Sequence, residues 1–310
     1  MVQDVGAFIP EFYSKKLLKE SKEMTDFKNN MTNSDWEGEI KSAGDTVHIS
    51  TPDLSMITIG EGVVPDTSDV YPKQLSLTID KSKSFQFKFN DIEQAQSQFN
   101  MLDGYMSAAN EKMMVEVNKE LELEVLNNTE VPNIGTNAAA FEATSATINK
   151  FFNKLKRTLM SNKALSPAGF YTFKGNQEQT LQLKPVVTIG SGLFEQLVNS
   201  TVLTHPTVQG DDILYKGVVG QIAGMQIFVD TLLDSIKSTE ASKHYADEGN
   251  NKYIAIAGTK MGITYAEQYN KVEKLRDPQT FADIGRALYL YGYKITNPKC
   301  LVKGTVEVTA

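Results

Sequence analysis

The chain has 310 residues and a formal net charge of −7, with 41% hydrophobic and 22% charged residues. Such values are typical of globular chains, so intrinsic disorder, collagen and coiled coil are excluded for the bulk of the sequence. No apolar run reaches the ~18 residues of a membrane span, and the first residues lack the basic-then-apolar pattern of a signal peptide. The single cysteine, Cys300, excludes an internal disulfide and any multi-cysteine metal site.

The negative charge is concentrated in residues 91–130, which hold nine acids and two bases. This segment accounts for the whole net charge, because the remaining acids and bases balance. No segment has the basic pattern of a nucleic-acid footprint. The sequence therefore predicts one acidic surface on an otherwise neutral chain, without tight phosphate binding.

Residues 1–44 have no strong hydrophobic period, which indicates an extended arm or, alternatively, a frayed terminus. Residues 46–89 follow the pattern of a long hairpin with a glycine- and proline-rich turn region. Its return side, 75–89, alternates apolar and polar residues, which predicts one strand of about 15 residues and roughly 50 Å. The apolar positions on its one face are Leu75, Leu77, Ile79, Phe85, Phe87 and Phe89.

Residues 91–127 show apolar side chains every three or four positions, which predicts a single helix roughly 55 Å long. Asn127–Asn128 and Pro132 end the pattern. The acids are expected to lie away from the apolar stripe, on a solvated face. A strand and a helix of this length fit poorly inside one compact globule, whose radius of gyration is near ~19 Å. We therefore expect the face of Leu75, Leu77 and Ile79 to protrude and to be covered by neighbouring subunits.

Beyond the long helix, residues 144–160 have the pattern of an amphipathic helix, whereas 163–184 are loop-rich. The block 185–260 has the sequence pattern of a separate α/β unit, with two short strands around Gly224. Two further strands are predicted at 263–274 and 285–297, and a short strand closes the chain.

Motifs for chemistry are absent from the sequence. The three histidines are isolated, and the glycine-bearing segments match neither dinucleotide-binding, P-loop nor nucleophile-elbow patterns. Arg276 and Asp277, followed by Asp283 and Arg286, have the spacing of a salt-bridged turn that could set register between subunits. We therefore predict no catalytic, cofactor-binding or metal-binding residues.

The order of these parts resembles the major capsid proteins of tailed bacteriophages. Segments 35–52 and 75–97 are similar to the extended loop and the start of the spine helix of that family. Segment 183–198 is similar to the strand and helix that open the axial domain, and 217–233 to the strand pair inside it. Segment 255–301 is similar to the return through the peripheral domain. The resemblance covers nearly the whole chain, although no single motif is diagnostic.

The resemblance implies an α+β fold of the Hong Kong 97 type. Its implied domains are an N-terminal arm (1–44), an extended loop (45–90), a peripheral domain (91–184, with the spine helix at 91–127), an axial domain (185–260) and peripheral return strands (261–310). Segment 163–184 departs from the family by its length, and could form a hairpin that contacts a neighbour or a decoration protein.

The implied function is structural: self-assembly into hexamers and pentamers that form an icosahedral shell around double-stranded DNA, without cofactors. The implied partners are further copies, a separate scaffolding protein, a portal and possible decoration proteins, with no membrane. The location would be the virion capsid, after assembly in the bacterial host cytoplasm. The candidate interface residues are Phe12, Lys73, Leu75, Leu77, Ile79, Asp211, Asp212, Arg276 and Asp277.

Other functions remain open at this point. An encapsulin-type compartment would share the fold but enclose an enzyme cargo. A soluble two-domain enzyme would be a compact monomer or dimer with a defined pocket, and a tail-tube or baseplate protein would form rings or tubes. The sequence does not give the triangulation number, the host, the maturation trigger or covalent cross-linking.

Overall fold

The computed structural model describes residues 25–34, 46–51, 73–90, 101–144, 146–162, 164, 171–174, 180–183, 185–200, 220–241 and 243–309. These residues fall into two compact units. The hairpin unit contains Ser82–Met114 and Tyr269–Leu290. The sheet unit contains Val115–Gln268, Tyr291–Ala310 and the described residues of Glu23–Lys81.

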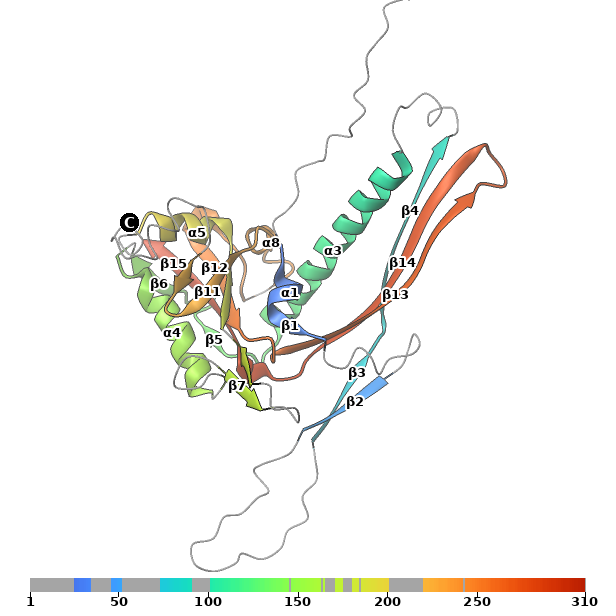
Figure 1. Cartoon of the computed structure of the whole chain (residues 1–310). Helices are drawn as coiled ribbons and strands as arrows, with labels where there is room; N and C mark the ends of the chain where they lie inside the picture. Colours follow the sequence, from blue (N-terminus) through green and yellow to red (C-terminus); the bar gives the residue numbers. More distant parts are fainter. Residues whose placement is uncertain are drawn as a thin grey trace, which may run out of the picture. The chain divides into compact units, whose positions relative to one another are not determined.

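The sheet unit is built on seven described strands in one mixed sheet (Figure 1). The order is β10-β11-β9-β12-β15, and both β5 and β6 pair with the far side of β15. Strand β12 is antiparallel to both its neighbours, whereas β9 and β11 are parallel. The strands are β5 (Asn133–Ile134), β6 (Phe141–Thr144), β9 (Val186–Ile189), β10 (Gln221–Ile222), β11 (Met225–Val229), β12 (Lys252–Gly258) and β15 (Leu301–Thr309).

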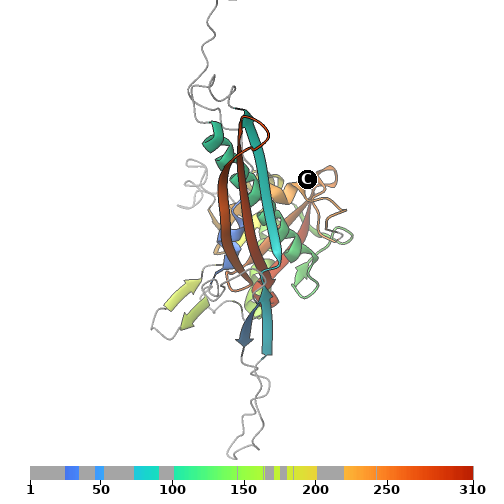
Figure 2. The same ribbon diagram turned by 90° about the vertical axis from the view of Figure 1, so that its right-hand side faces the viewer.

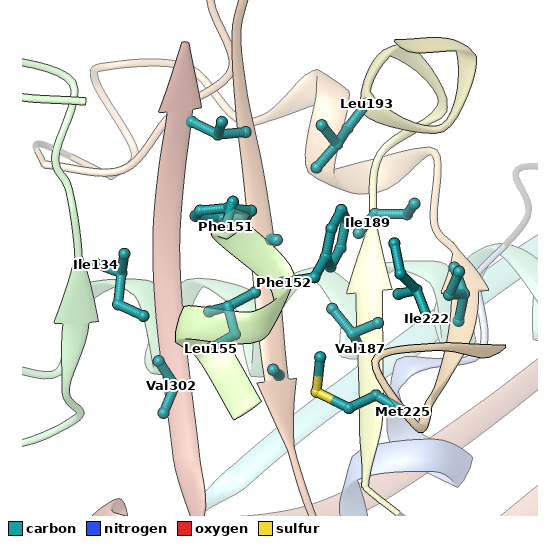
Figure 3. Close-up of a cluster of buried hydrophobic side chains, with 14 of the residues drawn as sticks. Ile134, Phe151, Phe152, Leu155, Val187, Ile189, Leu193, Ile222, Met225 and Val302 are labelled. Atoms are coloured by element: carbon teal, nitrogen blue, oxygen red, sulfur yellow. The ribbon is translucent and has the colours of Figure 1, made fainter. Parts of the chain in front are cut away.

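Helix α4 (Ile148–Ser161) covers one face of this sheet (Figure 3). Its apolar residues recur every three or four positions, so they form one stripe that packs onto the strands. The five side chains that the sequence places on this stripe are all fully buried: Ile148, Phe151, Phe152, Leu155 and Leu159. The predicted helix and its buried face are confirmed.

The predicted pair of short strands around Gly224 is also confirmed as β10 and β11. Ala223 and Gly224 both have positive φ, 52° and 77°, which is the backbone of a two-residue hairpin turn. Helix α5 (Ser191–Val198) follows β9, and the short helix α8 (Leu232–Ser235) follows β11. The predicted boundary at residue 260 does not coincide with an edge of the sheet, because β15 and β5 complete it.

Strands β13 (Ile263–Arg276) and β14 (Ala282–Ile295) form a long antiparallel hairpin in a second sheet, whose order is β1-β13-β14-β4. Figure 2 shows β4, β13 and β14 side by side. The predicted strand at 285–297 is confirmed as β14, along which Ala287, Tyr289 and Tyr291 are buried while Leu288 is more than one-third exposed. Two 3₁₀ turns, Glu248–Asn250 and Pro298–Cys300, precede β12 and β15.

The predicted strand 75–89 is two strands rather than one, so that prediction is wrong. Strand β3 (Lys73–Thr78) pairs with β2 (Thr46–Thr51), which confirms the hairpin pairing. Ile79 and Asp80 belong to neither strand, and the next strand, β4 (Lys81–Asn90), pairs with β14 instead of β2. Period-2 alternation continues across the break, which is why the sequence pattern did not show it.

Helix α3 is described from Met101 to Asn127, so its predicted end is confirmed and residues 91–100 lie outside the described residues. Within 163–184, β7 (Tyr171–Lys174) and β8 (Thr180–Leu183) form the anticipated hairpin.

The described part of the N-terminal region is folded rather than extended. Residues Phe27–Met31 form helix α1, and Thr32–Asn33 form β1, which is parallel to β13. Phe27 and Met31 are fully buried, and the Lys28 amide donates to Asn118 of α3. The expectation of an extended arm is therefore wrong for this segment.

Candidate interaction surface

The turn between β13 and β14 is organised by the carboxylate of Asp277. It accepts hydrogen bonds from the Gln279 amide (2.9 Å) and the Thr280 hydroxyl (2.6 Å), and it pairs with the Lys88 ammonium. The Asp277 amide donates to the Ala282 carbonyl at 2.9 Å, which closes the turn. The Lys88 ammonium, helped by these two donors, holds the pKa of Asp277 below its usual range. Four contacts on one residue make this a well-defined turn.

This turn presents Phe281 to solvent, with 83% of the residue exposed. Three of the other exposed large apolar residues among those described belong to the same unit: Tyr105, Leu275 and Leu288, at 37–43%. Partial exposure of leucine or tyrosine is common on protein surfaces. A nearly fully exposed phenylalanine on an ordered turn is less common, and aromatic anchors of this kind often carry binding energy. We therefore take Phe281 and its turn as the candidate interaction surface.

The charges around the turn are satisfied within the chain. Arg276 pairs with Asp283 at 3.1 Å, and the Arg286 Nε donates to Glu273 at 2.8 Å. The predicted salt-bridged turn therefore exists, but its partners are Arg276 with Asp283 and Asp277 with Lys88. Whether Arg276 and Asp277 also touch another subunit stays a prediction.

Two of the other candidate residues are covered by the chain itself. Leu77 is 0% and Ile79 is 2% exposed, whereas Leu75 is half-buried. The expectation that this face protrudes is therefore wrong for Leu77 and Ile79. Lys73 begins β3, and its side chain lies outside the described residues, as do Phe12, Asp211 and Asp212.

The reason for this burial is a close crossing at Gly292 of β14. A Cβ atom on Gly292 would lie 2.3 Å from the Thr78 carbonyl oxygen and 3.0 Å from the Ile79 Cα. The glycine lets β14 pass directly against the break between β3 and β4, which encloses the neighbouring apolar side chains. Beside it, the Lys81 ammonium donates to the Tyr293 hydroxyl at 2.5 Å, and the Tyr291 hydroxyl donates to Glu120 at 2.6 Å.

The expectation that the acids of α3 lie on a solvated face is also wrong at one position. Glu122 is completely buried, and its side chain interacts with the buried carboxyl group of Asp230. Burial raises the pKa of Asp230, although the interaction with Glu122 and the hydrogen bond from Thr25 oppose this effect. The Thr25 hydroxyl lies 2.8 Å from Asp230, so this acid pair joins α3, the end of β11 and the residues before α1.

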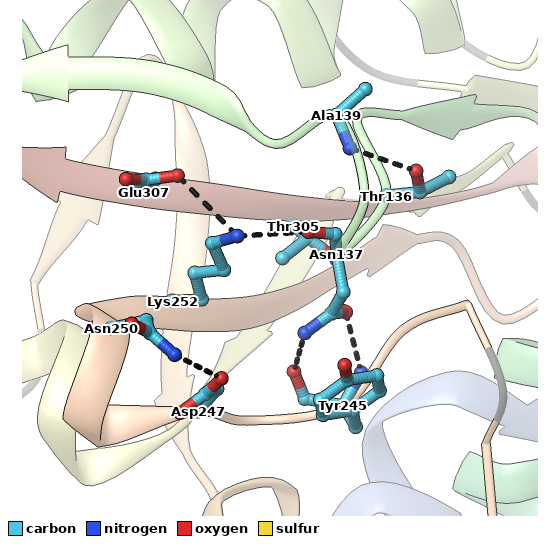
Figure 4. A network of polar contacts seen from close by, with 9 residues as sticks. All are labelled: Thr136, Asn137, Ala139, Tyr245, Asp247, Asn250, Lys252, Thr305 and Glu307. Carbon is cyan, nitrogen blue, oxygen red and sulfur yellow. Dashed lines mark hydrogen bonds and ion pairs between the residues drawn. The ribbon is translucent and has the colours of Figure 1, made fainter. Parts of the chain in front are cut away.

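Another buried polar network surrounds Asn137 (Figure 4). Its side-chain amide donates to the Tyr245 carbonyl at 2.7 Å and accepts from the Tyr245 amide at 2.9 Å, as a strand neighbour would. The Lys252 ammonium donates to the Asn137 carbonyl and pairs with Glu307 at 3.6 Å. These contacts hold the segment before β12 on the sheet, and their role is structural.

Two more buried groups, which sequence reasoning missed, lie next to this network. His244 is fully buried with its Nδ1 3.0 Å from the Thr305 hydroxyl, and burial lowers the pKa of His244 to about 4. The Lys303 ammonium donates to the carbonyls of Leu126 and Asn128 at the end of α3, at 2.7 and 2.6 Å. Burial lowers the pKa of Lys303 to about 8.

Within the described ranges, no three histidine, cysteine or acidic side chains gather as metal ligands would. Among the same residues, no helix is both long and apolar enough to cross a membrane.

No protein-family model and no curated protein sequence matches the chain. Solved structures do match. A chain from Mycobacterium phage Che8 is 21% identical, with a TM-score of 0.73 and 96% of both chains covered. A chain in the capsid structure of the cyanophage P-SCSP1u is 12% identical, with a TM-score of 0.68 over 98% of this chain and 94% of that one.

A chain of the cyanophage Pam1 capsid asymmetric unit is 11% identical, with a TM-score of 0.67 over 99% of this chain and 98% of that one. At these identities the likeness concerns the fold. It extends over almost the full length of both chains in each comparison, so it is not limited to one shared motif. The protein therefore has the mixed helix-and-sheet fold found in these phage chains, two of which come from capsid structures.

Proposed function

We propose that this chain is the major structural subunit of a tailed-phage capsid, built on a fold of the Hong Kong 97 type. The observation that carries the proposal is the near-complete, two-way coverage in the comparisons with phage capsid chains. The chain would act by association with further copies rather than by catalysis.

In this proposal the subunits form hexamers and pentamers that close into a shell around double-stranded DNA. Residues 1–44 would be the arm, with α1 and β1 as its folded part. Residues 45–90 would be the extended loop, 91–127 the spine helix and 185–260 the axial domain. A separate scaffolding protein, a portal and possible decoration proteins would be its partners. Assembly would take place in the bacterial host cytoplasm, and the mature location would be the virion.

The Phe281 turn supports the proposal as one contact surface between subunits. An aromatic side chain held on an ordered turn loses little conformational entropy when it enters a pocket on a neighbour. The surrounding ion pairs are already made within the chain, so they need not be broken on association. Burial of a whole phenylalanine side chain is favourable by roughly 1.5–3 kcal/mol, and the contact would recur with every subunit.

The test is assembly of the overexpressed full chain, followed by gradient sedimentation and negative-stain electron microscopy. We expect the wild type to form shells, tubes or spirals. Phe281→Ser should sharply reduce the fraction of assembled protein. Leu288→Ser, at an exposed apolar residue of β14, the strand that follows the turn, should reduce it much less. Phe281→Ser should unfold at the wild-type denaturant concentration, since Phe281 is 83% exposed. Leu288→Ser should unfold slightly earlier, since Leu288 is 37% exposed.

A wild-type chain that stays a compact monomer, alone and with a scaffolding partner, would contradict the proposed function. Shells that contain an enzyme cargo in place of DNA would favour a compartment of the encapsulin kind. If the wild type assembles and Phe281→Ser assembles equally well, the shell function stands and the role of the turn is wrong.

A further inference from the structure

Helix α4 carries only positive charges. Its four ionisable residues are Lys150, Lys154, Lys156 and Arg157, in a helix of 14 residues without an acid. Three of them, Lys150, Lys154 and Arg157, are exposed and follow one another at i, i+4 and i+7, so they lie along one side of the helix. We call these three residues the basic stripe. Among the described residues none of the three forms an ion pair, although Lys154 lies 5.1 Å from the ring of Phe141.

The part of α3 that belongs to the sheet unit carries the opposite charge. Glu116, Glu120 and Glu124 follow one another at i, i+4 and i+8, and we call them the acidic stripe. Glu116 and Glu124 are exposed. Glu120, between them, is half-buried and accepts the hydrogen bond from Tyr291. At 1.5 Å per residue the acidic stripe is about 12 Å long and the basic stripe about 10.5 Å.

The two helices contact opposite faces of the seven-stranded sheet. Lys303 of β15 points to the end of α3, where its ammonium reaches the backbone carbonyls. The next residue, Gly304, lies against α4, because a Cβ atom there would be 3.0 Å from the Phe151 ring. Successive residues of a strand point to opposite faces. The acidic and basic stripes therefore cannot meet within one chain.

We propose that the basic stripe on α4 docks against the acidic stripe on α3 of a second copy. Two complementary patches on one chain produce a head-to-tail contact, which closes into rings when the rotation between copies allows it. The proposal rests on the proposed function, since it assigns a specific contact to the ring-shaped capsomers of a shell. The partner that binds the basic stripe is a second copy, because the chain itself supplies an acidic stripe of matching length and opposite charge.

The contact would mainly fix orientation and register. Ion pairs between exposed side chains are weak one by one and are screened by salt, whereas reversed charges in the same place repel. Assembly should therefore weaken as ionic strength rises. Reversal of either stripe alone should prevent the correct pairing, while reversal of both should restore it.

The experiment is a charge swap in the full-length chain. One variant combines Lys150→Glu, Lys154→Glu and Arg157→Glu; a second combines Glu116→Lys and Glu124→Lys; a third carries all five changes. The matched control is Lys260→Glu, Lys294→Glu and Lys299→Glu, three exposed bases elsewhere in the sheet unit. Sedimentation velocity at several salt concentrations gives the protein concentration at which half the chains are assembled.

We expect each single-stripe variant to raise that concentration by about tenfold or more, and the five-residue variant to return close to the wild type. The control should differ little from the wild type. Thermal unfolding of each variant separates misfolding from failed association. If the variant with the charge-reversed α4 does not fold, the neutral set Lys150→Gln, Lys154→Gln and Arg157→Gln replaces it. This set should raise the half-assembly concentration by a smaller factor.

Four results would overturn the contact. If the single-stripe variants assemble like the wild type, the contact is wrong and the shell function stands. If the single-stripe variants lose assembly and the five-residue variant does not regain it, the stripes do not face each other. A basic-stripe variant that assembles normally but no longer retains DNA would assign the stripe to nucleic acid. A wild type that never assembles would overturn the contact and the proposed function together.

Discussion

In the sheet unit the described large apolar side chains are mostly buried, with Met160 as the exception at 38% exposure, and α4 covers its face of the sheet with five side chains that are fully enclosed. In the hairpin unit more of the large apolar side chains are exposed. Four of the large apolar residues found exposed among those described belong to it, including Phe281 at 83%. Its ion pairs Arg276–Asp283 and Arg286–Glu273 lie at the surface, whereas the charged group of Lys303 in the sheet unit is enclosed.

This difference indicates a division of roles. Buried apolar contacts and enclosed polar groups determine the free energy of unfolding. Exposed apolar groups on an ordered turn add little to that free energy and are available to a partner. Changes in the sheet unit should therefore act mainly on stability, and changes at the Phe281 turn mainly on association.

The largest expected effect is the loss of a core side chain. Phe152→Ala should lower the free energy of unfolding by about 3–5 kcal/mol, since the ring is fully buried between α4 and the sheet. Chemical denaturation of the unassembled chain measures it. Met160→Ala, on the exposed side of the same helix, is the control and should cost less than about 1 kcal/mol. Equal effects for the two changes would contradict the division of roles.

The next effect is a pH dependence that comes from His244. Its pKa in the folded chain, about 4, lies below the ordinary 6.5 because burial disfavours the charged ring. Between these pH values the unfolded chain binds a proton that the folded chain does not, so stability is lost as pH falls from 6.5 towards 4. The wild type should lose roughly 2–3 kcal/mol more than His244→Gln between pH 7 and pH 4. Parallel pH profiles for the two proteins would show that the ring is not held neutral.

A smaller effect is expected at Lys303. Lys303→Met should lower the free energy of unfolding by about 1–3 kcal/mol, because the carbonyls at the end of α3 lose their donor in a buried place. Amide hydrogen exchange should also become faster in the last turn of α3. Lys299→Met, an exposed lysine shortly before it, serves as the control. A stability unchanged by Lys303→Met would mean that water replaces the ammonium at no cost.

The smallest effect is expected for the exposed pair Arg286–Glu273. A double-mutant cycle with Arg286→Gln and Glu273→Gln should give a coupling below about 1 kcal/mol. The coupling should shrink further between low and high salt, because the Arg286 side chain is 50% and the Glu273 side chain 32% open to solvent. A coupling of several kcal/mol would place this pair with the enclosed groups of the sheet unit and would remove the contrast between the two units.

Local patterns in the sequence were sufficient for several elements. The stripe of α4, the strand β14, the end of α3 at Asn127 and the turn at Gly224 were all predicted and are confirmed. The salt-bridged turn that surrounds Phe281 was also located, although Phe281 itself was not singled out. Its position beside Pro278 and Asp277 in a turn is the signal that could have found it.

Only the tertiary structure decided which surfaces are covered. Period-2 alternation showed that Leu77 and Ile79 share a face, but not that β14 crosses them at Gly292. The acid-rich pattern of α3 gave no sign that Glu122 is buried against Asp230, which lies more than a hundred residues away along the chain. Periodicity is a property of neighbouring residues, so the sequence by itself determines elements and their faces. Burial depends on which distant segment packs there, and this is decided only when the chain folds.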